Sequence, residues 1–198
     1  MTSSTGRPSV IVVTGPSGAG KGTLIRELLE RVPELEVTVS ATTRDRRPGE
    51  EDGREYWFLE PDEFLARIES NAFLEHVVYV SGHRYGTLRS ELERIRGKGH
   101  VPLLELETEG ARRVKAEDPR AVTIFISAAV DELERRLRER ATESTGEIGE
   151  RIALARQQLE EADSFDYVVE NDDLERAVEE LTELCRGLLD SAGTISPR

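Results

Sequence analysis

A glycine-rich loop between an apolar run and a helical pattern constrains this chain more than any other feature. Residues 15–21 read Gly-Pro-Ser-Gly-Ala-Gly-Lys, directly after the β-branched run 10–14 and at the start of a helical pattern. Strand, loop and helix in this order match G-x-x-x-x-G-K in the context that the pattern requires. Backbone N–H groups of such a loop converge on phosphate oxygens, while the helix N-terminus and the lysine add positive charge. The sequence therefore predicts a phosphate-binding loop rather than a bare glycine-rich turn.

The residue after the lysine departs from the commonest form of this loop. Many phosphate-loop enzymes carry a hydroxyl there that binds Mg²⁺ directly, whereas this chain has Gly22 and places the hydroxyl at Thr23. We therefore expect Mg²⁺ to be held mainly by nucleotide phosphates and waters, because it gives up its water reluctantly. The residues predicted to bind the nucleotide are Gly15, Pro16, Ser17, Gly18, Ala19, Gly20, Lys21, Gly22 and Thr23.

Apolar runs and helical patterns alternate along most of the chain. Continuous apolar runs favour strands that are buried on both faces of a parallel sheet, and the alternation indicates an α/β fold. In the final helical pattern, Cys185 lies on an apolar stripe and is interpreted as a core residue. We expect strands at 10–14, 37–40, 103–106, 122–126 and 167–169, and helices at 21–31, 87–96, 131–140, 147–162 and 174–189.

Size and charge exclude several classes of function. A chain of 198 residues fits one domain, or one core with small inserted lobes. The net charge of −13, from 27 basic and 40 acidic residues, argues against a nucleic-acid polymer or an anionic membrane as partner. The single cysteine cannot form an internal disulfide, and neither a secretory signal nor a membrane-spanning run is found. We therefore expect a cytoplasmic protein.

Two segments interrupt the alternation. Residues 41–86 hold arginines, glycines and most of the aromatic residues in short alternating runs with turn residues, which predicts a small β-rich lobe. Residues 136–151 are charged or small and cannot build a core of their own, which predicts a mobile flap.

A basic loop follows the second predicted strand. It runs from Ser40 to Glu50 and includes Arg44 and Arg47. Arginine forks match phosphate oxygens in a bidentate manner, although such a loop on its own is more often solvated. Further motifs follow it: Gly-Arg-Glu-Tyr-Trp-Phe at 53–58, Phe-Leu-Glu-His at 73–76 and Tyr-Gly-Thr at 85–87.

Together these motifs resemble the guanylate kinase family, from about Ser9 to Leu189 and most densely between Ser40 and Thr87. The resemblance implies transfer of the γ-phosphoryl group of ATP to GMP, with Mg²⁺. It implies one α/β domain over 1–198: a P-loop kinase core with a five-stranded parallel sheet flanked by helices, an inserted small β-rich NMP-binding lobe and a mobile lid. The expected bounds are core 9–39, 87–130 and 152–190, lobe 40–86, and lid 131–151.

The resemblance also assigns roles to the residues of the lobe. Glu75 and Thr87 would contact guanine, because a carboxylate accepts N–H bonds from the guanine edge in a pattern that adenine does not offer. The residues assigned to the GMP phosphate are Ser40, Arg44, Arg47, Tyr56 and Tyr85.

The segment 103–110, Leu-Leu-Glu-Leu-Glu-Thr-Glu-Gly, resembles a further family motif. Glu105 and Glu107 alternate with leucines, so both are expected to point from the end of one strand toward the phosphates. The resemblance links Glu105 indirectly to Mg²⁺ and Glu107 to guanine. Where the family often has Asp and Gln, this chain has Glu107 and Glu109.

The lid resemblance rests on Arg136, Arg140 and Arg151, with Ala141 where the family often has glycine. Arginines on a helix are more often solvated than bound to a ligand. The resemblance to the family's lid favours arginines that close over the phosphates instead. Asn171 lies in a segment that resembles the one beside the ATP base, and the same segment also suits a helix N-terminal cap.

The predicted catalytic residues are Lys21, Arg44, Arg136, Arg140 and Arg151, since phosphoryl transfer needs alignment and charge neutralisation. Three alternatives stay open. They are a non-catalytic guanylate-kinase-like interaction module, a kinase for another nucleoside monophosphate, and an enzyme for a modified or deoxy guanine nucleotide. The expected partners are the small molecules GMP and ATP, and the sequence is compatible with a monomer or a homodimer.

Overall fold

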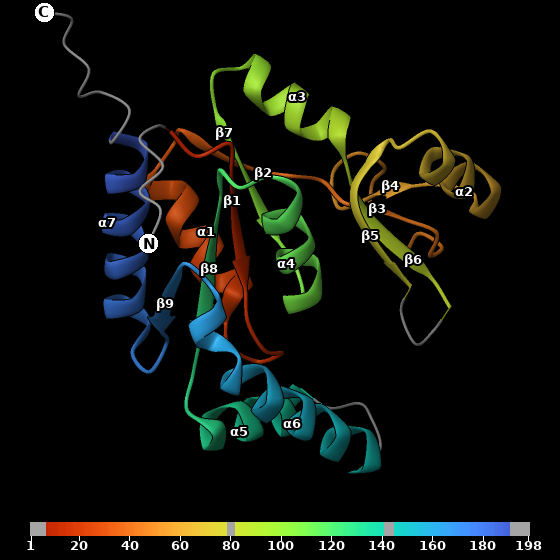
Figure 1. The fold of residues 1–198 in the computed structure, drawn as a ribbon. Helices are drawn as coiled ribbons and strands as arrows, with labels where there is room; N and C mark the ends of the chain where they lie inside the picture. Colours follow the sequence, from red (N-terminus) through yellow and green to blue (C-terminus); the bar gives the residue numbers. More distant parts are fainter. Residues whose placement is uncertain (1–6, 79–81, 141–144, 191–198) are drawn as a thin grey trace, which may run out of the picture.

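The computed structural model describes residues 7–78, 82–140 and 145–190 (Figure 1), apart from the side chains of 137, 139–140 and 145–148. Its centre is a five-stranded sheet in the order β2-β7-β1-β8-β9, and every neighbouring pair is parallel. This confirms the α/β fold that the sequence predicts. The strands are β1 (Val10–Thr14), β2 (Leu35–Val37), β7 (Val101–Glu105), β8 (Ala121–Ser127) and β9 (Tyr167–Glu170).

Helices cover both faces of this sheet (Figure 1). Successive side chains of a strand point to opposite faces, so Ile11 packs with one helical layer and Val12 with the other. The first layer comes from α1 (Lys21–Arg31) and α7 (Leu174–Asp190), and the second includes α3 (Arg89–Gly97) and α4 (Thr108–Glu117). Because β1 is buried on both faces, all five of its residues are apolar or small.

A second, smaller sheet forms a lobe beside the core, to the right in Figure 1. Its strand order is β4-β3-β6-β5. Phe64 and Phe73 stack with ring centroids 4.3 Å apart and belong to its apolar core. The elements are β3 (Ala41–Thr42), β4 (Trp57–Phe58), α2 (Pro61–Glu69), β5 (Phe73–Val78) and β6 (Arg84–Leu88).

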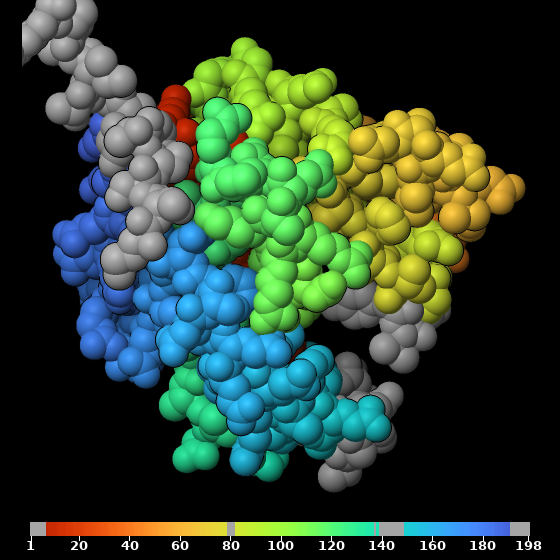
Figure 2. Space-filling view, in the orientation of Figure 1, coloured from red at the N-terminus to blue at the C-terminus, as the bar shows by residue number. Residues whose placement is uncertain are grey.

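The remaining elements are α5 (Val130–Arg140), α6 (Thr145–Glu160) and the short 3₁₀ helix η1 (Ala162–Ser164). Helices α5 and α6 occupy most of the segment predicted as a lid, whose mobility stays a prediction. In Figure 2 they form one projection from the body of the molecule, and the small lobe forms another. Within the described ranges, no helix combines the length and apolar character needed to cross a bilayer.

Several predicted boundaries were wrong. The predicted strand 37–40 ends at Val37, and the predicted helix 87–96 begins at Arg89 because Thr87 pairs within the small sheet. Helices α2 and α4 were not predicted, although Pro61 at the first position of α2 is a helix-start signal. Cys185 is fully buried in the core, and burial raises the pKa of its thiol to about 12.

Candidate functional site

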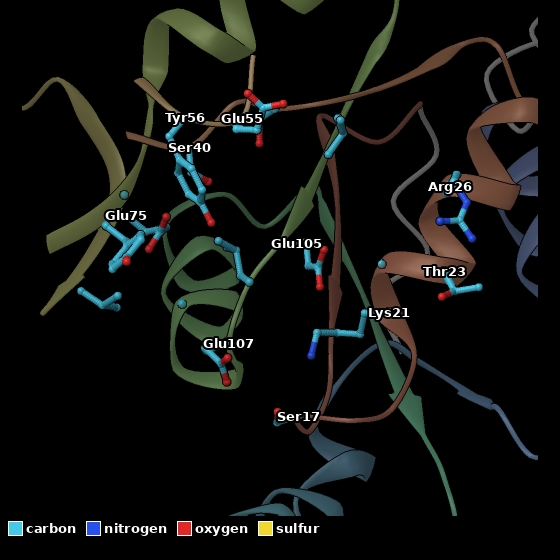
Figure 3. Close-up of a pocket in the computed structure, with 18 of the residues that line it drawn as sticks. Ser17, Lys21, Thr23, Arg26, Ser40, Glu55, Tyr56, Glu75, Glu105 and Glu107 are labelled. Carbon is cyan, nitrogen blue, oxygen red and sulfur yellow. The ribbon is translucent and has the colours of Figure 1, made fainter. Parts of the chain in front are cut away.

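A cleft of about 750 Å³ lies between the glycine-rich loop and the small sheet. In Figure 3, Ser17, Lys21 and Glu105 come from the core side, while Tyr56 and Glu75 come from the small lobe. The cleft is therefore lined both by residues that the sequence predicts to bind ATP and by residues that it predicts to bind GMP.

Two glycines of the loop are required by close backbone and side-chain contacts. Gly15 has a φ of 136°, and a Cβ there would lie 2.2 Å from the carbonyl oxygen of Ile126. Gly20 has a φ of 88°, and a Cβ there would lie 2.4 Å from Nδ2 of Asn171. Both the positive φ and the lack of space favour glycine, so the glycine pattern of the sequence corresponds to a real geometric need.

Asn171 braces the same loop from the end of β9. Its side chain is 3% exposed, and Nδ2 donates a hydrogen bond of 2.7 Å to the carbonyl oxygen of Ala19. Asp173 performs the helix-capping function that the sequence left open for this segment, because its Oδ1 accepts from the backbone N of Arg176 at 2.9 Å. Asn171 thus contacts the nucleotide loop itself.

Lys21 folds back over the loop that it ends. Its Nζ donates to the carbonyl oxygens of Gly15 at 2.7 Å and Pro16 at 3.2 Å. Burial lowers the pKa of Lys21, and the charges of Glu107 and Glu105 act in the opposite direction. The ammonium group is therefore stabilised by acceptors that phosphate oxygens could replace.

Glu105 ends strand β7 beside the lysine (Figure 3). Burial raises the pKa of its carboxyl group, and Lys21 opposes that shift. A Cβ on Gly22 would be 3.9 Å from Oε2 of Glu105, so the carboxylate faces the first turn of α1. Among the described residues, no group of three or more His, Cys, Asp or Glu could hold a metal. One carboxylate beside a phosphate loop fits a Mg²⁺ ion held mainly by phosphates and waters.

Glu107 lies beyond the end of β7, so the prediction that it projects from the same strand as Glu105 is wrong. The chain turns at Glu107 into α4, whose first residue is Thr108. Glu107 still lines the cleft with Glu105, because α4 begins at the carboxyl end of the sheet.

Arg44 is held in place at the edge of the small lobe. Its Nη1 and Nη2 donate to Glu50 Oε2 and Oε1 at 3.0 and 2.8 Å, and its Cζ lies 5.5 Å from the centre of the Tyr56 ring. The backbone N of Arg47 also donates to Glu50, at 2.8 Å, while the residue itself is exposed. The sequence assigned no role to Glu50. The turn that brings Glu50 back to Arg44 could have indicated their contact.

Two tyrosines contact each other on the lobe side of the cleft. The rings of Tyr56 and Tyr85 meet edge to face with centroids 5.9 Å apart, and both line the cleft with Ser40. Burial raises the pKa of Tyr56, with a further contribution from Tyr85, so its hydroxyl stays protonated near neutral pH and can donate a hydrogen bond.

Glu75 and Thr87 are paired across strands β5 and β6. The hydroxyl of Thr87 donates to Oε1 of Glu75 at 2.9 Å, and Glu75 is only 6% exposed. Burial raises the pKa of Glu75, while the hydrogen bonds from Thr87 lower it. A buried carboxylate on the wall of a cleft is suited to accept N–H bonds from a ligand.

Two of the three lid arginines reach the glycine-rich loop. Nη1 of Arg136 donates to the carbonyl oxygen of Gly18 at 3.2 Å, and Nη2 of Arg151 donates to Oγ of Ser17 at 2.7 Å. Arg140 is the last residue of α5, and its side chain lies outside the described part of the structure, as does the whole of Ala141.

The family model described as guanylate kinase matches residues 7–187 of this chain. The chain belongs to the guanylate kinase family. It is 47% identical over 184 residues to a guanylate kinase of Rubrobacter xylanophilus, covering 92% of this chain and 96% of that protein. It is 46% identical over 179 residues to a guanylate kinase of Synechococcus sp. (strain JA-3-3Ab), covering 90% and 82%.

A solved structure of guanylate kinase from Anaplasma phagocytophilum also resembles the present one. The two share 28% sequence identity with a TM-score of 0.69, over 96% of this chain and 97% of that one. Family membership and fold therefore agree with the resemblance seen in the motifs.

In this member of the guanylate kinase family, a buried acid without a predicted role joins the lobe to the core. Glu91 is 3% exposed. Its carboxylate accepts from the backbone N of Val39 at 3.0 Å, from Nε1 of Trp57 at 3.2 Å and from Arg94 at 2.9 and 3.0 Å. Its place on an ordinary charged helix gave no sequence signal, because two of its partners, Val39 and Trp57, come from other segments and only Arg94 lies on the same helix.

Proposed function

We propose that this chain is a guanylate kinase that transfers the γ-phosphoryl group of ATP to GMP and releases ADP and GDP. The observation that carries the proposal is the cleft itself, which has a phosphate loop with Lys21 on one wall and the buried carboxylate of Glu75 on the other. A phosphate cradle alone would suit many nucleotide enzymes, and the second wall adds a means of selecting the acceptor base.

The donor nucleotide binds on the core side in this proposal. Backbone N–H groups of residues 15–23 hold the phosphates of ATP, Lys21 neutralises their charge, and Asn171 keeps the loop in position. When bound with ATP, Mg²⁺ would neutralise charge on the phosphates. Glu105 is proposed to hold a water of that ion, an assignment that rests on its position beside Lys21 and Gly22.

The acceptor binds on the lobe side. We assign its base to Glu75, Thr87 and Glu107, and these contacts are supported by the Glu75–Thr87 hydrogen bond and by the place of Glu107 on the cleft wall. The residues assigned to the GMP phosphate are Ser40, Arg44, Arg47, Tyr56 and Tyr85.

The reaction requires alignment of the attacking and leaving oxygens, and it requires no general acid or base. An oxygen of the GMP phosphate attacks the γ-phosphorus of ATP, and the bond from that phosphorus to the bridging oxygen of ADP breaks. Charge on the transferring group is neutralised by Lys21 and by the lid residues Arg136, Arg140 and Arg151. We propose that segments 40–86 and 131–151 close over the cleft, which excludes water that would otherwise accept the phosphoryl group.

We further propose a cytoplasmic protein that acts as a monomer or a homodimer. The location is supported by the single cysteine of the chain, which is free and buried. One chain supplies both described walls of the cleft, so either oligomeric state is compatible with the chemistry.

The test is ADP release from ATP and Mg²⁺ in a coupled assay, with GMP, dGMP, AMP, CMP and UMP offered in turn. We expect turnover with GMP, at least tenfold weaker turnover with AMP, and turnover with GMP about 1,000-fold lower in Lys21→Ala. Saturable GMP binding without turnover would instead support an interaction module. A preference for another monophosphate would overturn the assignments of Glu75 and Glu107.

A further inference from the structure

Gly110 is a buried glycine on the cleft wall that the mechanism above leaves without a role. It is the third residue of α4, and its backbone has no positive φ. A Cβ at this position would lie 3.5 Å from Oε2 of Glu75, 3.5 Å from Cβ of Leu106 and 3.7 Å from Cδ1 of Leu106. These are ordinary van der Waals separations, so the folded chain has room for a methyl group here.

The folding of α4 gives no reason for this glycine. Alanine is a better helix former than glycine, and Gly110, in the first turn of α4, meets neither a clash nor a left-handed backbone. By contrast, Gly86 lies against the same acid for a structural reason, because a Cβ there would be 2.7 Å from the carbonyl oxygen of Glu75. Neither the backbone conformation nor the neighbours of Gly110 therefore require a glycine at this position.

The two oxygens of Glu75 have different surroundings. Oε1 accepts the hydroxyl of Thr87, whereas Oε2 is the oxygen that faces Gly110. A donor N–H must approach to 2.7–3.2 Å to bond a carboxylate, and a methyl group at 3.5 Å would occupy part of that approach. The lack of a side chain at Gly110 keeps the second oxygen open to the cleft.

We propose that Gly110 is a specificity-determining residue that leaves space beside Glu75 Oε2 for the N–H edge of the acceptor's purine base. This inference rests on the proposed function, in which Glu75 recognises guanine. In this proposal, the glycine at the start of α4 sets the width of the part of the cleft that binds the base.

The matched pair Gly110→Ala and Gly187→Ala tests the inference. Both change a helical glycine to alanine, and a Cβ on the exposed Gly187 would meet nothing within 4 Å. We expect both variants to unfold at or above the parent's temperature. We expect Gly110→Ala to raise KM for GMP about tenfold, with KM for ATP and kcat within twofold of the parent, while Gly187→Ala changes none of these constants.

An unchanged KM for GMP in a folded Gly110→Ala variant would overturn the inference. A lower kcat at unchanged KM would also overturn it, as would a lower unfolding temperature with every Michaelis constant unchanged, because both results would make the glycine structural. These failures leave GMP-dependent turnover of the parent intact. A parent that turns over no GMP would instead overturn the proposed function and this inference with it.

Discussion

The two walls of the cleft are built in different ways. The donor wall, to which we assign ATP, is formed by backbone: the loop from Gly15 to Lys21 approaches its neighbours so closely that a Cβ at Gly15 would lie 2.2 Å from a carbonyl oxygen of β8. The acceptor wall, to which we assign GMP, is formed by side chains such as Glu75 and Tyr56, which are held by a hydrogen bond from Thr87 and a ring contact with Tyr85.

This difference determines how each wall can be recognised in the sequence and what a substitution in each wall should change. The donor wall depends on consecutive residues between one strand and one helix, so its pattern is local. The acceptor wall depends on residues as far apart as Ser40 and Tyr85, which line one cleft because strands β3 and β6 pair. Damage to the first should remove transfer or the fold, and damage to the second should change which acceptor is used.

The largest effect is expected for Lys21→Ala. It removes the one full positive charge of the loop, so kcat should fall about 1,000-fold, as for loss of a preorganised charge-stabilising donor. The coupled assay measures this effect, and the exposed Lys98→Ala serves as control. A fall in kcat of less than about tenfold would show that Lys21 has no major role in phosphoryl transfer.

Gly15→Ala should cost about 3 kcal/mol of unfolding free energy, because strained φ and a backbone clash add. Gly49 has a φ of 90°, but a Cβ there would meet nothing within 4 Å, so Gly49→Ala should cost only about 1 kcal/mol. Denaturant unfolding of both variants isolates the clash. Equal losses would mean that the loop can relax away from β8.

Glu75→Gln should reduce kcat/KM for GMP about 30-fold, near 2 kcal/mol, because a charged acceptor is lost. Turnover with AMP should change little, so discrimination between the two bases falls. The assay is the ratio of the two kcat/KM values, with the exposed Glu109→Gln as control. A ratio unchanged from the parent's would remove Glu75 from base recognition.

The substitution Glu75→Gln should stabilise the fold although it weakens the use of GMP, because burial raises the pKa of Glu75. A carboxyl whose folded-state pKa lies above its unfolded value contributes stability below the unfolded pKa and loses it as pH rises through the folded pKa. Glu75→Gln should therefore raise the unfolding free energy at pH 7, and this gain should shrink in acid. Denaturant unfolding against pH measures both, and a gain that grows in acid would contradict the burial argument.

The smallest effect is expected for Glu50→Gln. The amide keeps part of the contact with Arg44 but loses its charge, so KM for GMP should rise about threefold with kcat nearly unchanged. Steady-state kinetics at several GMP concentrations test this, with Glu63→Gln on α2 as the exposed control. A fall in kcat alone would place Arg44 in the transfer step without a binding role.

The sequence predicted the secondary structure around the glycine-rich loop correctly, while the nucleotide-binding roles of the loop residues stay predictions. Strand 10–14 and helix 21–31 agree with β1 and α1 to the residue, because strand period, glycine pattern and helix start all act within one short segment. The residues of the acceptor side were found through family resemblance, and their roles stay predictions. Glu50, Glu91 and Gly110 were missed because their significance depends on contacts between distant segments, and α4 was missed because its apolar stripe is short and begins among acids.

Equilibrium titration of GMP into Lys21→Ala and Glu75→Gln tests the division of labour between the two walls most directly. The account predicts that Lys21→Ala binds GMP with a Kd within about threefold of the parent's, while Glu75→Gln binds about 30-fold more weakly. The reverse order, with GMP affinity lost in Lys21→Ala and kept in Glu75→Gln, would contradict the assignment of donor and acceptor to opposite walls.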